Sequence, residues 1–519
     1  MEISHFPAKS KAKYSNLVGM SAGVLLQPGK GRRKLSGAVA TVVSIWFLTG
    51  CSQFDLKREL ERSQQQLQQG LSPSTVGATN TAALGTESRA LPAVSQQSTQ
   101  AGFEAYFEQA LSQQQAVQLA LQHSPAIQAR LANYQQTGWQ LDQQSYLLNP
   151  RLSLERQRQG AETELSRILS VSLLDMLSLP ERRNWVQHAL AQAQTQLVSD
   201  LIAQSLLVKQ AWLQAIAAER SEQILQDTAA LYQAAAELAQ AMQSAGNFSV
   251  QQAERFAVAE AEFKSQLWAA QLRRQQSRSQ LARLIGWPLS QQAQLRLPEN
   301  LPALPAQLAS ASSVSQEVLP QRLDLQASAS RLKLAFSTAR LALPESLGQI
   351  ELGWRQQRNK SEGEAVKYTR GVEVSLSLPV FNWGDASRQA SLAGSQAAAW
   401  DYQNNLQMAA YQVADAYQDY LSSHAIAQHH LQSVLPLRQR LAQQSLLRYN
   451  GMLISVFDLL DEVKLRLQAE LAQQQHLLNF HLSELKLQAA LAGVPGFAET
   501  SGIAGETPRN NTATAGDHK

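Results

Sequence analysis

The chain repeats one series of sequence signals at a distance of about 205 residues. A short alternating run, Leu169–Leu174, precedes a very long polar helical pattern, and a second run, Val374–Pro379, precedes another. Each series closes with a glycine followed two residues later by a proline, and these glycines, Gly286 and Gly493, lie 207 residues apart. Repeats of this size are duplicated domains rather than solenoid units, whose periods are about 20–50 residues. We therefore expect two quasi-equivalent halves.

The composition favours long helices over a compact enzyme core. The 519 residues are 17% charged and 6% aromatic, which is typical of helical rods. The formal net charge of +4 is misleading, because residues 1–50 hold seven Lys/Arg and one acid, which leaves 38 bases and 40 acids in the remainder. A basic surface for nucleic acid is therefore not supported.

The first 50 residues have the features of a secretion leader. A basic segment, Lys30–Lys34, precedes an apolar segment, Ala38–Leu48, which has signal-peptide length and is too short to span a bilayer. The leader is long if it starts at Met1, so Met20 is a second candidate start. We predict a signal peptide over residues 1–50.

Cys51 is the only cysteine and directly follows Leu48-Thr-Gly. A buried free thiol is the alternative reading, but the position after the apolar segment disfavours it. The segment resembles the lipobox of bacterial lipoproteins, which implies that Cys51 is acylated, with palmitate among the possible acyl chains, and becomes the mature N-terminus. Ser52 stands where an Asp would retain a lipoprotein in the inner membrane, so the resemblance implies the outer membrane.

The chain is expected to divide into five segments. After the leader, residues 51–102 form the lipidated N-terminus and a flexible tether, because residues 63–102 are rich in Ser, Thr, Gln, Gly and Ala. Residues 103–300 and 301–495 are the two repeats, and residues 496–519 are a disordered tail.

Each half should contain a long helical hairpin. Glu181 to Ala245 holds no Gly or Pro, and its 65 residues would make a helix of about 98 Å. Gly246–Ser249 supplies a turn and an N-cap, and the chain returns over Val250 to Ile285. In the second half we expect helices over Asp385–Asn450 and Val456–Ala492, joined by a turn at Asn450-Gly451 and capped by Ser455, with a kink or break at Pro436.

Shorter elements open each half. We expect opening helices over Ala126–Leu148 and Arg322–Leu343, followed by strands over 151–157, 165–173, 349–355 and 367–378. The last strand alternates cleanly, with one face formed by Val372, Val374, Leu376 and Leu378 and the other by Glu373, Ser375 and Ser377. Four strands cannot close by themselves, and an open sheet leaves unpaired backbone at its edges.

Pooling strands from several copies would form a closed barrel that can cross a membrane. In this organisation the chain resembles the TolC-like outer-membrane efflux protein family over residues 105–493, most specifically in Gly371–Gly384 and Arg448–Asp461. The resemblance implies a homotrimer with a twelve-stranded transmembrane β-barrel and a long periplasmic α-helical coiled-coil barrel. It implies a passive exit duct in a tripartite system with a periplasmic adaptor (membrane fusion) protein and an inner-membrane transporter.

Asp458 and Asp461 are the sharpest local feature. They share one helix face at i,i+3 on an otherwise apolar turn; a solvated acidic stripe is the simpler interpretation. The resemblance implies instead rings of aspartates at the narrow periplasmic entrance, which would attract cations and raise some of the carboxyl pKa values by mutual repulsion. The first half has Gln252 and Arg255 at the aligned positions.

Arg448 and Tyr449 fall where the family carries contacts that hold the entrance. The family's basic residue nearer the acids is replaced here by an apolar stretch ending at Ile454. The sequence therefore does not identify the contacts that hold the entrance closed.

Other candidate sites are weaker. Five histidines, at 424, 429, 430, 476 and 481, are interpreted as helix-surface residues without a metal. No Gly-rich phosphate loop, G-x-S-x-G or Cys nucleophile occurs, so no cofactor and no enzymatic activity are expected. A core position is the alternative for Trp354 and Trp383, but at the ends of strands they are expected at a membrane interface.

Two functions are weighed. The first is the exit duct, and the second is a structural periplasmic coiled-coil adaptor or spacer lipoprotein without a pore. An adaptor needs a lipoyl-like β domain and one hairpin, whereas this chain has two hairpins and two pairs of strands, which favours the duct. The sequence leaves open the substrate and whether the transporter serves drug or metal efflux or type I secretion.

Overall fold

The computed structural model describes residues 109–160, 162–308, 319–345, 350–361, 363, 365–377 and 383–494. The chain separates into two units, Met1–Ser52 and Gln53–Lys519, and all described residues belong to the second. The predicted leader, Cys51, the tether over 63–102 and the tail lie outside the described residues.

The described chain is mainly helical with one small sheet, as predicted. The first series of elements is α4 (Gln113–His123), α5 (Pro125–Gln144), β1 (Arg151–Gln159), β2 (Glu162–Ser172), α6 (Leu173–Ser244) and α7 (Val250–Ile285). After the 3-10 turns η2 (Leu289–Gln294) and η4 (Leu319–Gln321), the second series is α8 (Leu323–Glu345), β3 (Ile350–Lys360), β4 (Lys367–Leu376), α9 (Asp385–His429), the π-helical turn η5 (His430–Val434), α10 (Leu435–Asn450) and α11 (Val456–Ala492).

Helices α7 and α11 begin and end where the sequence predicts. Their N-caps, Ser249 and Ser455, each accept a hydrogen bond from the backbone N–H three residues on. Both helices end at a glycine in the left-handed conformation, with φ of +75° at Gly286 and +69° at Gly493. Local capping chemistry therefore sets these four ends.

Helix α6 begins eight residues earlier than predicted and contains Pro180, so the expected start at Glu181 is wrong. Ser172 caps the helix by accepting from the Asp175 backbone N–H at 3.2 Å. The Asp175 carboxylate accepts from the Leu148 N–H at 2.8 Å and pairs with Arg182 at 2.7 Å. These contacts stabilise the additional turns, and they outweigh the backbone hydrogen bond that the proline removes.

The interruption predicted at Pro436 takes the form of a π-helical turn, in which the helix is locally wider. The π-helical turn His430–Val434 directly precedes Leu435 and the proline, and α10 then continues to Asn450. A proline lacks its N–H and crowds the carbonyl four residues back, and a π turn relieves both effects without ending the helix.

The four strands form one antiparallel sheet in the order β1-β2-β3-β4. The registers place Trp354 beside Leu169 and Val372, and Leu352 beside Val171 and Val374. We call face A the side formed by even-numbered residues of β1, β3 and β4 and odd-numbered residues of β2, and face B the opposite side. The predicted alternation is confirmed for Val372 to Leu376, while Leu378 lies outside the described residues.

Large apolar side chains on face A are exposed, including Val372, Val374, Leu152 and Leu154 at 63–73%. Monomeric soluble proteins seldom expose contiguous apolar surface of this kind. The outer strands β1 and β4 each pair with one other strand in the part of the chain that the structure describes. The sheet therefore has two open edges and one apolar side.

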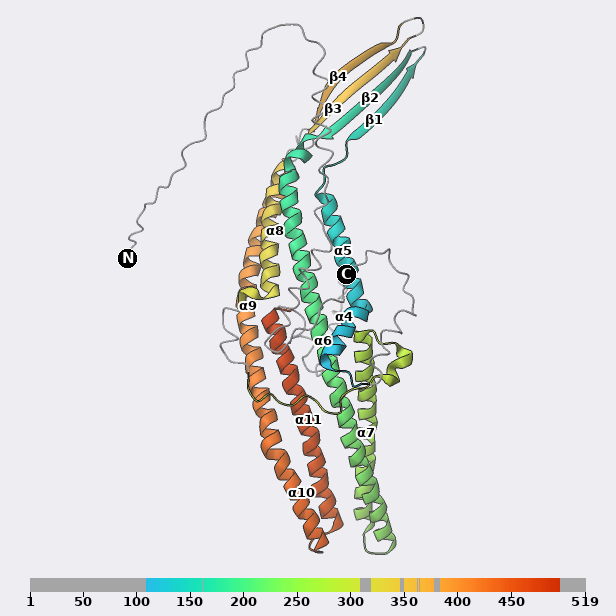
Figure 1. Ribbon diagram of the computed structural model, residues 1–519, viewed down its shortest axis with the longest axis vertical. Helices are drawn as coiled ribbons and strands as arrows, with labels where there is room; N and C mark the ends of the chain where they lie inside the picture. Colours follow the sequence, from blue (N-terminus) through green and yellow to red (C-terminus); the bar gives the residue numbers. More distant parts are fainter. Residues whose placement is uncertain are drawn as a thin grey trace, which may run out of the picture. The chain divides into compact units, whose positions relative to one another are not determined.

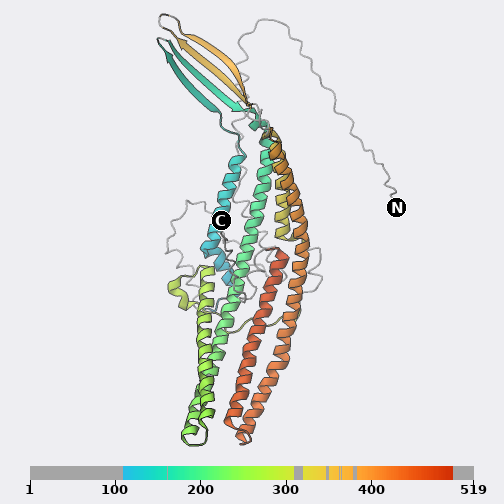
Figure 2. The ribbon, with the colours of Figure 1, turned by 180° about the vertical axis from the view of Figure 1, so that it is seen from behind.

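The helices run between the sheet and two helix–helix turns (Figures 1 and 2). The turns after α6 and α10 lie together at the end opposite the sheet (Figure 1). The 72 residues of α6 extend about 108 Å. None of the described helices is long and apolar enough to cross a membrane.

The main core lies midway along α6, where its residues are buried almost all round. Ile202, Leu206 and Ile216 are 0–2% exposed and pack with α4, α5 and the end of α7. Trp212 Nε1 donates to the Leu111 carbonyl at 2.8 Å, which ties the start of the described chain to α6.

The two terminal glycines pack against the starts of the two halves. A Cβ on Gly286 would lie 2.6 Å from the His123 carbonyl oxygen, and one on Gly493 would overlap the Asp324 carboxylate and lie 2.8 Å from the Arg322 Cβ. Arg322, at 2% exposed, pairs with Asp324 and donates to the Ala409 carbonyl at 3.0 Å. Each half therefore closes on its own opening segment.

Candidate functional site

Asp458 and Asp461 lie in the first two turns of α11, beside the turn that ends α10. Both side chains are exposed. Asp458 completes a capping box, because its Oδ2 accepts from the Ser455 N–H at 3.0 Å and from the Ser455 hydroxyl at 2.7 Å. The structure therefore gives Asp458 a local structural role that the sequence interpretation did not include.

The first half builds the same capping box without a charge. Gln252 Oε1 accepts from the Ser249 N–H at 3.0 Å and from the Ser249 hydroxyl at 3.1 Å. An amide thus serves the cap as well as a carboxylate. The negative charge of Asp458 is additional to what the helix end needs.

Hydrogen bonds from the Ser455 hydroxyl and N–H lower the pKa of Asp458. Within one chain this direction is opposite to the rise expected from repulsion within a ring of acids, because these bonds favour the ionised form. Asp458 is therefore an anion at neutral pH.

Asp461 lies near a cluster formed by three helices. Burial raises the pKa of Tyr232, on α6, to about 12, and the Asp461 carboxylate adds to the rise. The Tyr232 ring stacks on Phe263 of α7 with centroids 4.5 Å apart, and Lys464 Nζ lies 5.7 Å and 5.8 Å from the two centroids. This arrangement brings one acid of the pair alongside the α6–α7 hairpin.

Arg448 and Tyr449 shape the turn through their backbones. Their carbonyl oxygens accept from the N–H groups of Leu453 and Met452, both at 2.8 Å. No polar contact of their side chains is present among the described residues, so the expected entrance contacts of these side chains stay a prediction. Met452 has φ of +58°, the conformation that Gly246 adopts in the first hairpin.

An aromatic cluster joins the ends of the two hairpins. The Phe457 ring, on α11, lies 4.8 Å from Phe248 in the first turn and 4.5 Å from Phe256 on α7, between ring centroids. Sequence reasoning missed these residues, since they do not occupy equivalent places in the two halves. Only the packing of one hairpin against the other brings them together.

The interpretation of all five histidines as surface residues is wrong for two of them. His424 and His481 are 8% and 6% exposed and flank Phe480. His481 Nε2 lies 2.9 Å from the Pro302 carbonyl oxygen, and His424 Nε2 lies 3.4 Å from that of Pro305. The segment that connects the two halves crosses α9 and α11 here and covers both rings, which the helical pattern alone cannot reveal.

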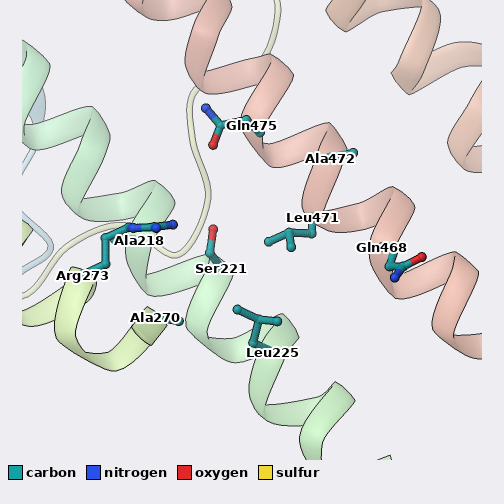
Figure 3. A pocket seen from close by; sticks show the side chains of 9 residues that line it. All are labelled: Ala218, Ser221, Leu225, Ala270, Arg273, Gln468, Leu471, Ala472 and Gln475. Carbon is teal, nitrogen blue, oxygen red and sulfur yellow. The ribbon is translucent and has the colours of Figure 1, made fainter. Parts of the chain in front are cut away.

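A cavity of about 330 Å³ lies between α6, α7 and α11 (Figure 3). Its lining is mostly small, aliphatic and amide side chains, and Arg273 is its one ionisable residue. The close-up shows Leu225 of α6 and Leu471 of α11 directed into the space between their helices (Figure 3). Among the described residues no three His, Cys, Asp or Glu side chains gather where they could hold a metal ion.

No protein-family model and no curated protein matches the sequence. Solved structures do match the fold. The outer membrane protein VceC of Vibrio cholerae is 16% identical, with a TM-score of 0.59 over 73% of this chain and 96% of that chain.

Two further structures agree with this likeness. The CmeC outer membrane channel of Campylobacter jejuni has a TM-score of 0.62 at 15% identity, over 75% of this chain and 88% of that chain. The open state of the MtrE outer membrane channel of Neisseria gonorrhoeae has a TM-score of 0.54 at 19% identity, over 74% and 89%. The chain therefore has the fold of the TolC-like outer-membrane channels.

Proposed function

We propose that this protein is the outer-membrane channel of a tripartite efflux or export system. The observation that carries the proposal is the sheet, which is open at both edges and apolar on one face, at one end of two long helical hairpins. An open sheet with an apolar side is stable in a membrane only when its edges are paired. The similar folds of VceC, CmeC and MtrE, each described as an outer membrane protein or channel, support this function.

The proposed assembly is a homotrimer. The edge strand β4 of one copy would pair with β1 of the next, and four strands from each of three copies give a barrel of twelve strands. Face A would then lie toward lipid and face B toward the lumen. The two series of elements would be copies of one unit, and their helices would form the periplasmic coiled-coil barrel.

In this assembly the helix–helix turns lie farthest from the membrane. Asp458 and Asp461 of three copies would converge at the periplasmic entrance, with Arg448 and Tyr449 beside them. A periplasmic adaptor protein and an inner-membrane transporter would dock at this end. Cys51, acylated, would anchor the N-terminus in the outer membrane, and residues 51–102 would tether it to the first repeat.

The experiment measures mass and conductance on the full chain in detergent and in planar bilayers. A mass three times that of the chain with stable conductance is expected. A monomeric mass contradicts the trimer. A trimer without conductance contradicts the duct and favours the alternative, a spacer lipoprotein without a pore.

Paired lysine substitutions test the two faces. Val374→Lys places a charge on the apolar face and should cost roughly 2–4 kcal/mol of barrel stability near the membrane midplane. Ser375→Lys, one residue on, places the charge on face B opposite Glu351 and should be tolerated. Equal loss of assembled trimer in the two variants would contradict the assignment of face A to lipid.

A further inference from the structure

The two faces of the strands differ in their charged side chains, because face A carries only bases and face B carries every acid together with three bases. All five glutamates of the strands lie on face B: Glu155, Glu162, Glu164, Glu351 and Glu373. Face A carries six bases and no acid: Arg156, Arg158, Arg167, Arg358, Lys360 and Arg370. The faces therefore differ in charge as well as in polarity.

The six bases also occupy one end of face A. Near the helices its cross-strand rows are wholly apolar, such as Val374–Leu352–Val171 and Val372–Trp354–Leu169–Leu152. The next row brings together Arg370, Gln356, Arg167 and Leu154, and the row after it Tyr368, Arg358, Leu165 and Arg156. Successive rows are about 7 Å apart. The bases thus form a belt, which we call the basic belt, along the end of the strands away from the helices.

Among the described residues, no acid neutralises the belt. Face B pairs its charges across strands, at 3.4 Å for Arg151–Glu351 and 2.9 Å for Arg355–Glu373. None of the six belt residues forms an ion pair with a residue that the structure describes, and all six are exposed. Arg158 Nε donates to the Gly160 carbonyl at 3.4 Å, which leaves its charge uncompensated.

Pairing between strands of neighbouring copies would add no acid to face A. Every face-A position of the strands is free of Asp and Glu, so pairing β4 with β1 of another copy extends the same uncompensated belt. Six bases at the border of an apolar surface need anions, and phosphate groups bind arginine through paired charge-assisted hydrogen bonds. Long side chains can lie along the apolar surface and extend their charged ends toward the headgroups.

We propose that the basic belt binds the phosphorylated headgroups of lipids in the leaflet farther from the helices, of the kind that lipid A carries. This inference rests on the proposed membrane barrel. It adds a lipid-recognition surface to the channel, built from face-A residues of all four strands. The apolar rows hold the acyl chains and the belt holds the phosphates above them.

The test compares four arginine substitutions on the belt with four elsewhere. The belt variant is Arg156→Gln/Arg167→Gln/Arg358→Gln/Arg370→Gln. The control variant removes four exposed arginines on helices: Arg255→Gln/Arg283→Gln/Arg331→Gln/Arg440→Gln. The full-length trimer, stripped of lipid, is titrated with bisphosphorylated lipid A, with lipid A lacking phosphates, and with inorganic phosphate as competitor, and bound lipid is counted by native mass spectrometry.

Wild type and control variant should bind bisphosphorylated lipid A with equal affinity. The affinity of the belt variant should be at least about tenfold lower, because each base near an anionic lipid surface raises the affinity roughly fivefold. Phosphate-free lipid A should bind all three proteins equally weakly, and inorganic phosphate should not compete. Equal binding by belt variant and wild type, or by the two lipids, would overturn the proposal. Displacement by inorganic phosphate would overturn the assignment to lipid.

Conductance separates this proposal from the one on which it rests. Trimers of wild type and belt variant should conduct alike in bilayers, because the belt lies outside the lumen. Conducting trimers that bind no lipid A would refute lipid binding by the basic belt and would still support the proposed channel. A protein that neither trimerises nor conducts would refute the channel.

Discussion

The Asp458 carboxylate accepts two hydrogen bonds from Ser455, one from its backbone N–H and one from its hydroxyl, at 3.0 Å and 2.7 Å. Gln252 and Ser249 form the same pair of bonds in the first half. The helix end therefore requires an acceptor at this position and does not require a charge. The charge and the cap can be removed separately.

Replacing the acid pair by amides should remove cation block while the helix remains. In Asp458→Gln/Asp461→Asn the amide at 458 can keep the capping box, as Gln252 does, but no carboxylate remains to attract cations. Divalent or trivalent cations added on the periplasmic side of a planar bilayer should block wild type and not the variant, whose conductance should rise.

Ser455→Ala is the matched control. It removes the cap and keeps both acids, so block should persist while helix stability falls by about 1 kcal/mol. Equal block in the amide variant and wild type would mean that the two acids are a solvated stripe.

Alanine at either terminal glycine should destabilise the protein by roughly 2–4 kcal/mol. Gly286→Ala and Gly493→Ala each place a Cβ at positive φ and against a neighbour, the His123 carbonyl in one half and the Asp324 carboxylate in the other. Thermal unfolding of the full chain measures the loss.

Gly246→Ala provides the comparison for this prediction. Gly246 also has positive φ, at +78°, but nothing lies within 4 Å of its Cβ position. Only the conformational cost of about 1 kcal/mol applies there. A loss as large as that of Gly286→Ala would show that packing against the opening segments adds nothing.

The π-helical turn should weaken as pH falls. Burial lowers the pKa of His430 from 6.5, and charge on His476 and His429 lowers it further. The His430 and His476 rings lie 4.7 Å apart. Because the folded pKa is below the unfolded one, the folded state binds fewer protons, so stability is full above about pH 6.5 and falls as pH drops from there through the folded pKa.

Hydrogen exchange measures this loss on the assembled full chain. Amides of residues 430–438 should exchange faster at about pH 5.5 than at about pH 7.5, after correction for intrinsic rates. His476→Gln should reduce the difference, and His188→Gln, on α6, should leave it unchanged. A pH response that is the same with and without His476 would contradict a role for the ring pair.

Lipid should be attached at Cys51. Cys51→Ala should abolish incorporation of labelled palmitate, and Ser52→Asp should keep the label while shifting the protein toward the inner membrane. The unlipidated protein should still insert in part, because the strands provide a second membrane attachment. A mature protein that begins upstream of Cys51 without lipid mass would rule this out.

Several features were predictable because neighbouring residues decide them. Ser249 and Ser455 set the starts of α7 and α11 through hydrogen bonds that span three residues. The period-2 pattern of β4 assigned Val374 and Ser375 to opposite faces, because alternation is a property of one strand. The acid pair could be placed at a hairpin end because the turn and the N-cap beside it are also set by neighbouring residues.

Other features depend on which distant segments meet. The start of α6 before Pro180 is stabilised by Asp175 contacts to Leu148 and Arg182. His424 and His481 are buried because the segment at Pro302 and Pro305 crosses them. Most of these contacts join residues far apart in the chain, so no short stretch of sequence can predict them.

By itself, the sequence determined the kinds of element, most of their ends and the alternation within each strand, since capping and periodicity act within a few residues. Only the tertiary structure decided the register of β2 against β3, which pairs Leu169 with Trp354 across 185 residues of chain. That register places six bases and no acid on face A, and all five glutamates of the strands on face B. A shift of one residue would have brought glutamates onto face A, because it moves every side chain of a strand to the opposite face.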